Sequence, residues 1–236
     1  MGRRVVPLTL DLLDRLPPHD APCRSCLCWA VDAVRRERIG PDLGSRVEAK
    51  DAWVSELLRE WGSCGRAIVL EAEPVGLVLY APPAFLPGAA AVPTAPASPD
   101  AVLVADIWVR PDLRGHGLGR LLVQATARDL LSRGGVRAME AFGRRGPGAP
   151  ACTAPVDFWL RTGFRTHRAH PVVPRVRMDL RSTVTWMDEV EAALERLVGV
   201  VRPAGVPVPR WSPDAPVPAV QRTTGTGEAG ASGQAV

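Results

Sequence analysis

Lysine is almost absent from this sequence of 236 residues: Lys50 is the only one, and arginine supplies every other basic side chain. Although the formal net charge is +4, the arginines are scattered, and no basic run is long enough to form a nucleic-acid-binding arm. The many prolines, glycines and alanines that accompany this bias are typical of a GC-rich genome. The composition therefore argues against nucleic acid as a partner.

Long apolar runs are also missing. The leucines of residues 8–16 are interrupted by Asp11, Asp14 and Arg15, so we expect no secretory signal there, and no later run is long enough to span a bilayer. The five cysteines are odd in number, in a chain without a recognisable export signal. We therefore expect a cytoplasmic protein with reduced thiols and no membrane partner.

Three of these cysteines, Cys23, Cys26 and Cys28, stand close together in the sequence. The spacing suits half of a zinc site or a redox pair, but a zinc site needs a second half, and Cys64 and Cys152 are far from each other. A free cysteine also behaves as a small buried apolar side chain. Ordinary buried thiols are therefore the favoured interpretation, and no metal is predicted.

Hydrophobic periodicity predicts an α/β chain. Strands are expected over residues 3–10, 66–71, 75–80, 101–109, 136–142, 164–167 and 175–180, and helices over 11–16, 48–61, 116–133, 153–161 and 186–198. Residues 101–142 follow the order strand, turn, helix, strand, which predicts a parallel or mixed sheet. We expect one domain over residues 1–202 and a disordered tail rich in Pro, Gly and Ala over 203–236. The helix 186–198 either packs on the domain or forms a homodimer contact.

The turn Arg114-Gly115-His116-Gly117-Leu118-Gly119 joins the strand 101–109 to the next helix. The start of a helix leaves backbone N–H groups without partners and carries partial positive charge. Glycines let a phosphate approach these groups closely, and arginines add charge nearby. The turn therefore predicts an anion site that suits a pyrophosphate.

Two other phosphate-binding motifs do not fit this turn. A Walker A loop requires Gly-Lys-Ser/Thr at its end, which is missing here. A dinucleotide fingerprint requires a third glycine where Arg120 or Leu122 stands, although Glu140 lies roughly where its acidic residue is expected. A purely structural role of the glycines, in a tight turn with close helix packing, also stays open.

With this turn the sequence resembles the GCN5-related N-acetyltransferase (GNAT) family, whose central motif Arg/Gln-x-x-Gly-x-Gly/Ala joins a strand to a helix. Arg114, Gly117 and Gly119 fill its three defined positions. A second family motif, Asn-x-x-Ala-x-x-x-Tyr-x-x-x-Gly-Phe, falls on residues 152–164, where Gly163 and Phe164 match at the family's spacing. The resemblance covers about residues 102–180 and extends to the hairpin before them.

The resemblance implies a mixed central sheet flanked by helices and splayed between its fourth and fifth strands, here 101–109 and 136–142. It implies acetyl-CoA as cosubstrate, with the pantetheine arm between those strands, and direct attack of a primary amine on the thioester in a ternary complex. The residues expected to hold acetyl-CoA are Trp108, Val109, Arg114, Gly115, His116, Gly117, Leu118, Gly119, Arg120 and Cys152.

Two acidic residues are candidates for the general base, because Asp106 and Glu140 interrupt apolar strands. Each is otherwise an outward-facing residue or the partner of an arginine. The sequence departs from the family at Cys152, where asparagine is common, and at Trp159, where a tyrosine often protonates the leaving thiolate. Trp159 has no hydroxyl, so that acid role does not carry over.

These departures leave three function classes open: an N-acetyltransferase, an acyl-CoA-binding regulatory protein with weak or no catalysis, and an interaction domain. The acceptor would be a small-molecule or protein amine, selected by residues 17–61 and 82–99. Neither segment has an acidic cluster of the kind that favours polycationic aminoglycosides.

Overall fold

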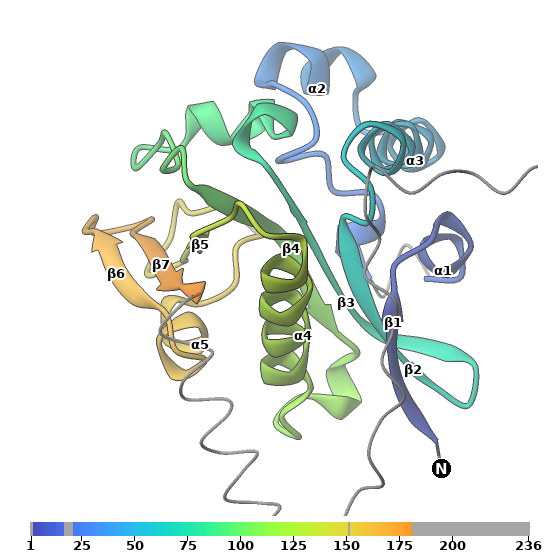
Figure 1. The fold of residues 1–236 in the computed structure, drawn as a ribbon. Coiled ribbons are helices and arrows are strands. Elements are labelled where there is room, and N and C mark those ends of the chain that lie inside the picture. The colour runs from blue at the N-terminus through green and yellow to red at the C-terminus, as the bar shows by residue number, and fades with distance from the viewer. Residues whose placement is uncertain (1, 17–20, 151, 181–236) are drawn as a thin grey trace, which may run out of the picture. The chain divides into compact units, whose positions relative to one another are not determined.

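The computed structural model describes residues 2–16, 21–150 and 152–180, which form a seven-stranded mixed sheet with helices on both faces (Figure 1). The spatial order of the strands is β1-β2-β3-β4-β5-β7-β6, and only the β4–β5 pair is parallel in this part of the chain. The strands are β1 (Arg3–Pro7), β2 (Gly65–Leu70), β3 (Glu73–Ala81), β4 (Ala101–Val109), β5 (Ala138–Phe142), β6 (Arg165–Arg168) and β7 (Arg175–Asp179). The helices are α1 (Leu10–Asp14), α2 (Ala33–Ile39), α3 (Leu43–Glu60), α4 (Leu118–Arg133) and α5 (Val156–Arg161). The predicted α/β class and mixed sheet are confirmed.

The sheet separates two hydrophobic clusters, because side chains alternate between the faces of a strand. The first cluster, around Leu57, Leu77 and Leu103, is covered by α1, α3 and the segment that follows α1. The second, around Leu122 and Val104, is covered by α4 and α5. In Figure 1 helix α4 runs across its face of the sheet. The two faces are therefore built from different parts of the chain.

Strands β4 and β5 diverge partway along their length. They pair over Ala101–Val104 and Ala138–Ala141, whereas β4 continues to Val109 and β5 ends at Phe142. The register between β3 and β4 shifts at the same place, so that Ala105 is an extra residue in β4. A β-bulge bends its strand and re-aims the side chains beside it. The structure thus confirms the predicted splay.

The β2–β3 hairpin was predicted correctly, and Glu71 and Ala72 at its tip adopt positive φ angles of 48° and 73°. Strand β1 ends earlier than expected, because the Thr9 side chain caps α1. Helix α3 starts five residues before the predicted Glu48, and the Asp42 side chain caps it. The predicted loop 82–99 contains two short 3₁₀ helices, Pro83–Phe85 and Pro87–Ala91.

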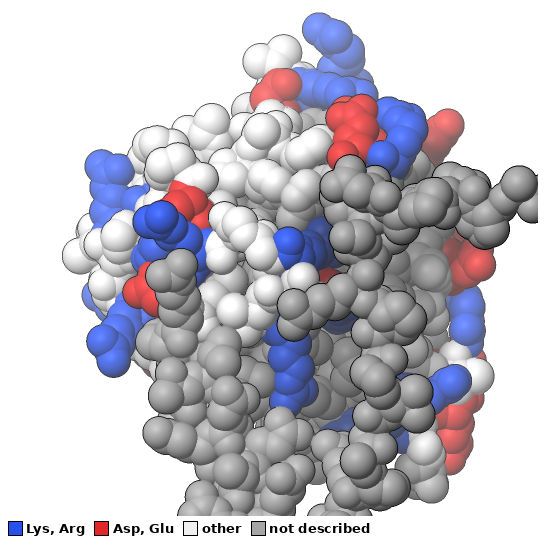
Figure 2. Space-filling model, in the orientation of Figure 1, with Lys and Arg blue, Asp and Glu red and all other residues white. Residues whose placement is uncertain are grey.

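On the face seen in Figure 2, basic and acidic side chains of the described residues lie beside one another. No helix within residues 2–16, 21–150 and 152–180 has the length and apolar character needed to cross a membrane. The predicted helix 186–198 and the predicted tail 203–236 lie outside the described residues.

Candidate functional site

The glycine turn between β4 and α4 has an open front. A 3₁₀ helix, Pro111–Leu113, leads into it, and Gly115 and Gly117 follow with φ angles of 81° and 79°. A Cβ added at either glycine would meet no atom within 4 Å, so only their backbone conformation requires glycine. Arg114 Nε donates to the Val109 carbonyl at 3.0 Å, which ties the turn to the end of β4. The ring Nδ1 of exposed His116 lies 2.9 Å from the Arg114 carbonyl.

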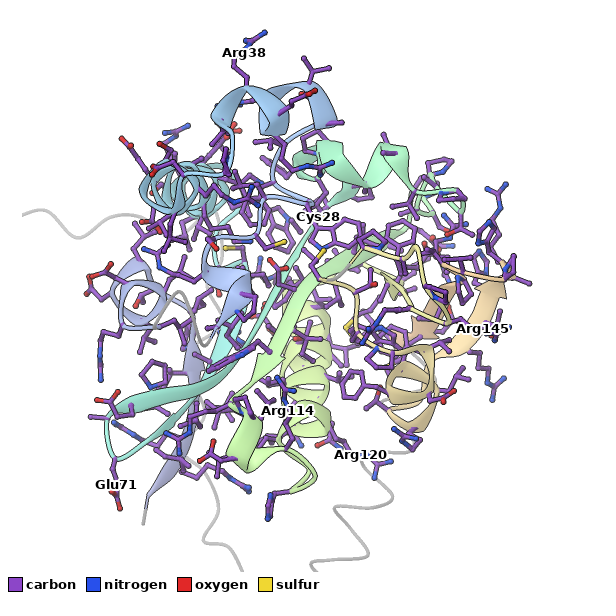
Figure 3. The ribbon with its side chains drawn as sticks, turned by 180° about the vertical axis from the view of Figure 1, so that it is seen from behind. Cys28, Arg38, Glu71, Arg114, Arg120 and Arg145 are labelled. Atoms are coloured by element: carbon purple, nitrogen blue, oxygen red, sulfur yellow. The ribbon has the colours of Figure 1, made fainter. Side chains whose placement is uncertain are left out.

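The start of α4 presents backbone donors to this turn. Gly117 is the N-cap and has no side chain, so it supplies no side-chain acceptor to the N–H groups of the first helical turn. The exposed side chains of Arg114 and Arg120 flank them, and Figure 3 shows both at this end of α4. Leu118 is different, because its side chain is buried in the core and only its backbone faces the turn. The turn combines donors and positive charge, as an anion site requires.

Gly119 has a packing role. A Cβ at this position would lie 2.7 Å from Phe158 Cε2, so helix α5 approaches α4 closely only because residue 119 has no side chain. The structural interpretation of the glycines therefore holds for Gly119, whereas Gly115 and Gly117 contact nothing on that side.

Substitution of Gly119 by alanine is expected to lower the free energy of unfolding by about 1–3 kcal/mol, because an extra methyl group overpacks a filled contact. The ring of Phe158 must move, and it stands edge-on to Trp159 at 5.0 Å. Urea denaturation measures the change. A double variant that also carries Phe158→Leu should regain part of the loss, and a single variant within about 0.5 kcal/mol of the parent would contradict the contact.

Asp106 lies beside the bulge of β4 and is paired with the only lysine of the chain. Lys50 Nζ from α3 lies 2.5 Å from Asp106 Oδ2 and 3.1 Å from the Cys26 carbonyl, and both side chains are at most 1% exposed. The second carboxylate oxygen, Oδ1, is buried without a hydrogen-bond partner among the described residues. Trp108, predicted to contact the cofactor, is buried on the same face in the first cluster. The carboxylate is thus held by an ion pair, with one oxygen unused.

Lys50 was not predicted as a site residue, although the sequence contained a signal for it. The buried residues of α3 are Lys50, Trp53, Val54 and Leu57, so the lysine lies on the apolar face of the helix. A lone lysine on such a face requires a buried counter-ion. Burial alone would lower the pKa of Lys50, but the charge and hydrogen bond of Asp106 outweigh it and raise that pKa above its ordinary value.

Glu140, the second predicted base, is fully buried at the centre of a polar network. Its carboxylate accepts from the Ser98 hydroxyl at 2.6 Å and the Ser98 N–H at 3.0 Å. Arg177 Nη1 lies at 3.3 Å and Arg175 Nε at 3.4 Å, and His167 Nε2 is 3.8 Å away. Both carboxylate oxygens of Glu140 therefore have cationic or hydroxyl neighbours, unlike those of Asp106.

Trp159, which stands where the family often has a tyrosine, and Tyr80, the only tyrosine of the sequence, are both buried on the α4 side of the sheet. The Tyr80 hydroxyl donates to Asp129 Oδ2 at 2.5 Å, and burial followed by this hydrogen bond raises the pKa of Tyr80. Trp159 packs edge-on against Phe158 and Phe164, and its indole N–H has no hydrogen-bond partner among the described residues. The Tyr80 hydroxyl is thus already committed to Asp129.

Cys152 does have sulfur neighbours, although the sequence isolates it. Its thiol lies within hydrogen-bonding reach of the thiols of both Cys26 and Cys28, from the segment between α1 and α2. Within the described ranges, no group of three or more His, Cys, Asp or Glu side chains is arranged to hold a metal ion. The structure therefore joins Cys152 to the cysteine motif that the sequence left without a second half.

A cavity of about 470 Å³ lies elsewhere, between α4, the end of α5 and strands β6 and β7. Its lining includes Arg120, Arg161, Arg165 and Arg177. Of the predicted cofactor-binding residues it contains Arg120 alone. The cavity is therefore separate from both the Asp106–Lys50 pair and the front of the glycine turn.

The sequence matches the model of a known protein family. The model of the Acetyltransferase (GNAT) family matches residues 32–164, more than half of the chain. No curated protein sequence matches the chain.

Several solved structures are similar. The PaiA N-acetyltransferase of Thermoplasma acidophilum, in complex with coenzyme A, is 10% identical, with 76% of this chain and 99% of that chain covered and a TM-score of 0.49. The loading GNATL domain of CurA from Lyngbya majuscula is 13% identical, with 77% and 100% covered and a TM-score of 0.49. The ribosomal-protein-S18-alanine N-acetyltransferase of Escherichia coli is 13% identical, with 76% and 94% covered and a TM-score of 0.43.

Proposed function

The chain belongs to the GNAT acetyltransferase family, and we propose that it transfers an acetyl group from acetyl-CoA to a primary amine of a small molecule or protein. The observation that carries this proposal is the divergence of β4 from β5 beside the bulge at Ala105, with the glycine turn at the end of β4. Divergence leaves backbone groups of β4 beyond Val104 without pairing to β5. An extended pantetheine arm can pair with such groups, as a strand would.

The residues of the turn fit a pyrophosphate. Space is open in front of Gly115 and Gly117, the first N–H groups of α4 face it, and two arginines flank it. We propose that the backbone of residues 115–119 binds the phosphates and that Arg114 and Arg120 neutralise their charge. Trp108, Val109 and Cys152 would line the pantetheine arm, and the N–H groups near Trp108 and Val109 would donate to the developing oxyanion.

For the general base we propose Asp106 ahead of Glu140. An amine must lose a proton before it attacks a thioester, and Asp106 Oδ1 is a carboxylate oxygen without a hydrogen-bond partner in the described part of the chain. Lys50 occupies Oδ2, which leaves Oδ1 to accept the proton. Glu140 offers no comparable oxygen, because Ser98, Arg175 and Arg177 already lie against its carboxylate.

A second candidate function, an acyl-CoA-binding regulatory protein without effective catalysis, is favoured by one observation. Trp159 is buried and lacks a hydroxyl, and the only tyrosine hydroxyl is bonded to Asp129. Calorimetric titration with acetyl-CoA tests the binding that both functions share, and release of free thiol with a panel of amines separates them. Failure to bind millimolar acetyl-CoA would remove both.

The variant Asp106→Asn is expected to lower kcat by about 10²–10⁴-fold, the usual contribution of a general base. Because the substitution leaves buried Lys50 without its counter-ion, the variant should be less stable, and kcat is compared at low temperature. An acetyl-CoA dissociation constant equal to that of the parent shows that the variant is folded under those conditions. Glu140→Gln is the matched control, with a smaller expected loss of kcat. A larger loss in Glu140→Gln than in Asp106→Asn would reverse the assignment of the base.

We further propose that the protein acts in the cytoplasm and does not bind nucleic acid. The scattered arginines of the sequence support the second point, and on the face seen in Figure 2 basic and acidic side chains lie beside one another.

A further inference from the structure

We propose that Cys26, Cys28 and Cys152 form a thiol-oxidation site, at which a peroxide converts Cys152 and one of the other two thiols into a disulfide. The disulfide would join the segment between α1 and α2 to the loop that precedes α5. Such a site is separate from acetyl transfer and depends on the contacts of the three sulfur atoms.

The thiol of Cys152 lies near those of Cys26 and Cys28 in the folded protein. Cys152 is distant in sequence from the other two cysteines, but its thiol is within hydrogen-bonding range of both. Figure 3 shows Cys28 over β4, between that strand and α2. A disulfide forms only where two sulfur atoms can meet without large backbone movement. The native fold brings Cys152 and its two neighbours into this arrangement.

The five cysteines differ in their exposure to solvent. Cys26, Cys28 and Cys152 are half-buried, whereas Cys23 is 8% exposed and Cys64 is fully buried. A small oxidant can therefore reach the three thiols that contact one another. Burial raises the pKa of Cys23 to about 12 and that of Cys64 to about 11, which keeps both protonated and unreactive at neutral pH.

The pKa values of the three thiols shift in different directions, which gives Cys26 and Cys152 different roles. The hydrogen bond from Cys152 lowers the pKa of Cys26 to about 7 in spite of burial and of nearby Asp106, and the charge of Lys50 assists. The same donor, Cys152, lowers the pKa of Cys28, with help from Arg36. The pKa of Cys152 is raised in turn, because the neighbouring Cys26 and Cys28 sulfur atoms, and then burial, favour its protonated form. Cys26 is thus the attacking thiolate and Cys152 the resolving thiol.

The chemistry balances with a hydroperoxide as the oxidant. The Cys26 thiolate attacks one peroxide oxygen, an S–O bond forms, and the O–O bond breaks; with hydrogen peroxide, the hydroxide that leaves takes up a proton to become water. The Cys152 sulfur then attacks the sulfenic sulfur, an S–S bond forms, and the hydroxyl leaves as water with the Cys152 proton. Two thiols lose two electrons and two protons, and hydrogen peroxide is reduced to two waters.

The cross-link would also act on acetyl transfer, a consequence that rests on the proposed function. The Cys26 carbonyl accepts a hydrogen bond from Lys50 Nζ, and Lys50 holds the proposed base Asp106. A disulfide between Cys26 and Cys152 would therefore restrict the backbone that holds Lys50, the partner of Asp106. It would also restrict Cys152, which is proposed to line the pantetheine arm. Oxidation is expected to lower kcat/KM by roughly tenfold, within the usual range of coupling between sites.

The test uses the full chain treated with hydrogen peroxide, alkylated, and digested with trypsin without reduction. Trypsin releases residues 25–35, with Cys26 and Cys28, and residues 146–161, with Cys152. The expected product is these two peptides joined, two hydrogens lighter than their sum. It should be lost in Cys152→Ser and retained in Cys64→Ser, and Cys26→Ser should form it more slowly, through Cys28.

Two results would overturn the site: a disulfide confined to peptide 25–35, or oxidation of Cys26 to sulfinic acid while Cys152 stays alkylatable. The activity measurement is separate. Loss of activity that is reversed by dithiothreitol, and that follows the fraction of cross-linked peptide, supports the coupling, whereas a complete cross-link with unchanged activity removes the coupling and leaves the site. If the reduced protein has no transferase activity, only the proposed function is overturned. The cross-link is detected by mass spectrometry, which does not depend on activity.

Discussion

Replacement of Lys50 by methionine is expected to lower the free energy of unfolding by about 3–5 kcal/mol, because removing one partner of a buried ion pair leaves the other charge uncompensated. Both side chains are at most 1% exposed, so water cannot replace the lost partner. Domains of this size are stable by only about 5–15 kcal/mol, so the variant should be close to unfolding at 37 °C. Urea denaturation followed by circular dichroism measures the change.

Two variants control this prediction. Lys50→Met combined with Asp106→Leu removes both charges and should recover most of the loss, since the cost lies in the unpaired charge and not in the missing pair. Arg59→Met removes a cation whose side chain is 71% exposed and pairs with Glu60, and it should cost no more than about 1 kcal/mol. Equal losses in Lys50→Met and Arg59→Met would contradict the burial of the pair.

The dependence of this pair on pH has a definite sign. The pKa of Lys50 is raised in the folded protein, so its contribution to stability is fully present below the pKa of the unfolded chain, about 10.4. The contribution is lost only as the pH rises through the folded value. The difference in stability between the parent and Lys50→Met should therefore stay constant over neutral pH.

Substitution of Gly117 by valine is expected to weaken acetyl-CoA binding by at least about 100-fold. Gly117 is the N-cap of α4 with a φ of 79°, which a β-branched residue adopts only with strain. The turn would have to refold, and its N–H groups would lose their common direction. Hydrogen bonds to a charged group contribute about 1.5–3 kcal/mol each, so two of them account for a loss of this size. Isothermal titration calorimetry measures it.

The opposite end of the same helix offers a matched control. Gly134 ends α4 with a φ of 72° and, like Gly117, has no atom within 4 Å of an added Cβ. Gly134→Val therefore introduces similar backbone strain at a place where no phosphate is expected. It should destabilise the protein without changing the affinity for acetyl-CoA. Equal affinity of Gly117→Val and the parent would disprove the pyrophosphate site.

Parts of the fold that depend on local sequence were predictable. Strand β4 runs over Ala101–Val109 as the sequence indicated, and α4 ends at Arg133 before two glycines. Helix α2 was missed because none of its residues is buried and Val34 is 69% exposed, so it has no hydrophobic period. Its Asp32 cap was the only local signal, and a cap alone does not define a helix.

What the sequence by itself determined is the glycine turn before α4, because glycine conformation and the start of a helix depend on residues that are adjacent in the chain. The environment of each functional side chain was decided by tertiary structure. Lys50 reaches Asp106 from α3, Ser98 and Arg177 reach Glu140, and Cys152 meets the segment after α1. Such pairs form only when the sheet and its covering segments pack, so no spacing along the chain encodes them. The bulge at Ala105 was also decided by tertiary structure, since it is defined by the register between β3 and β4.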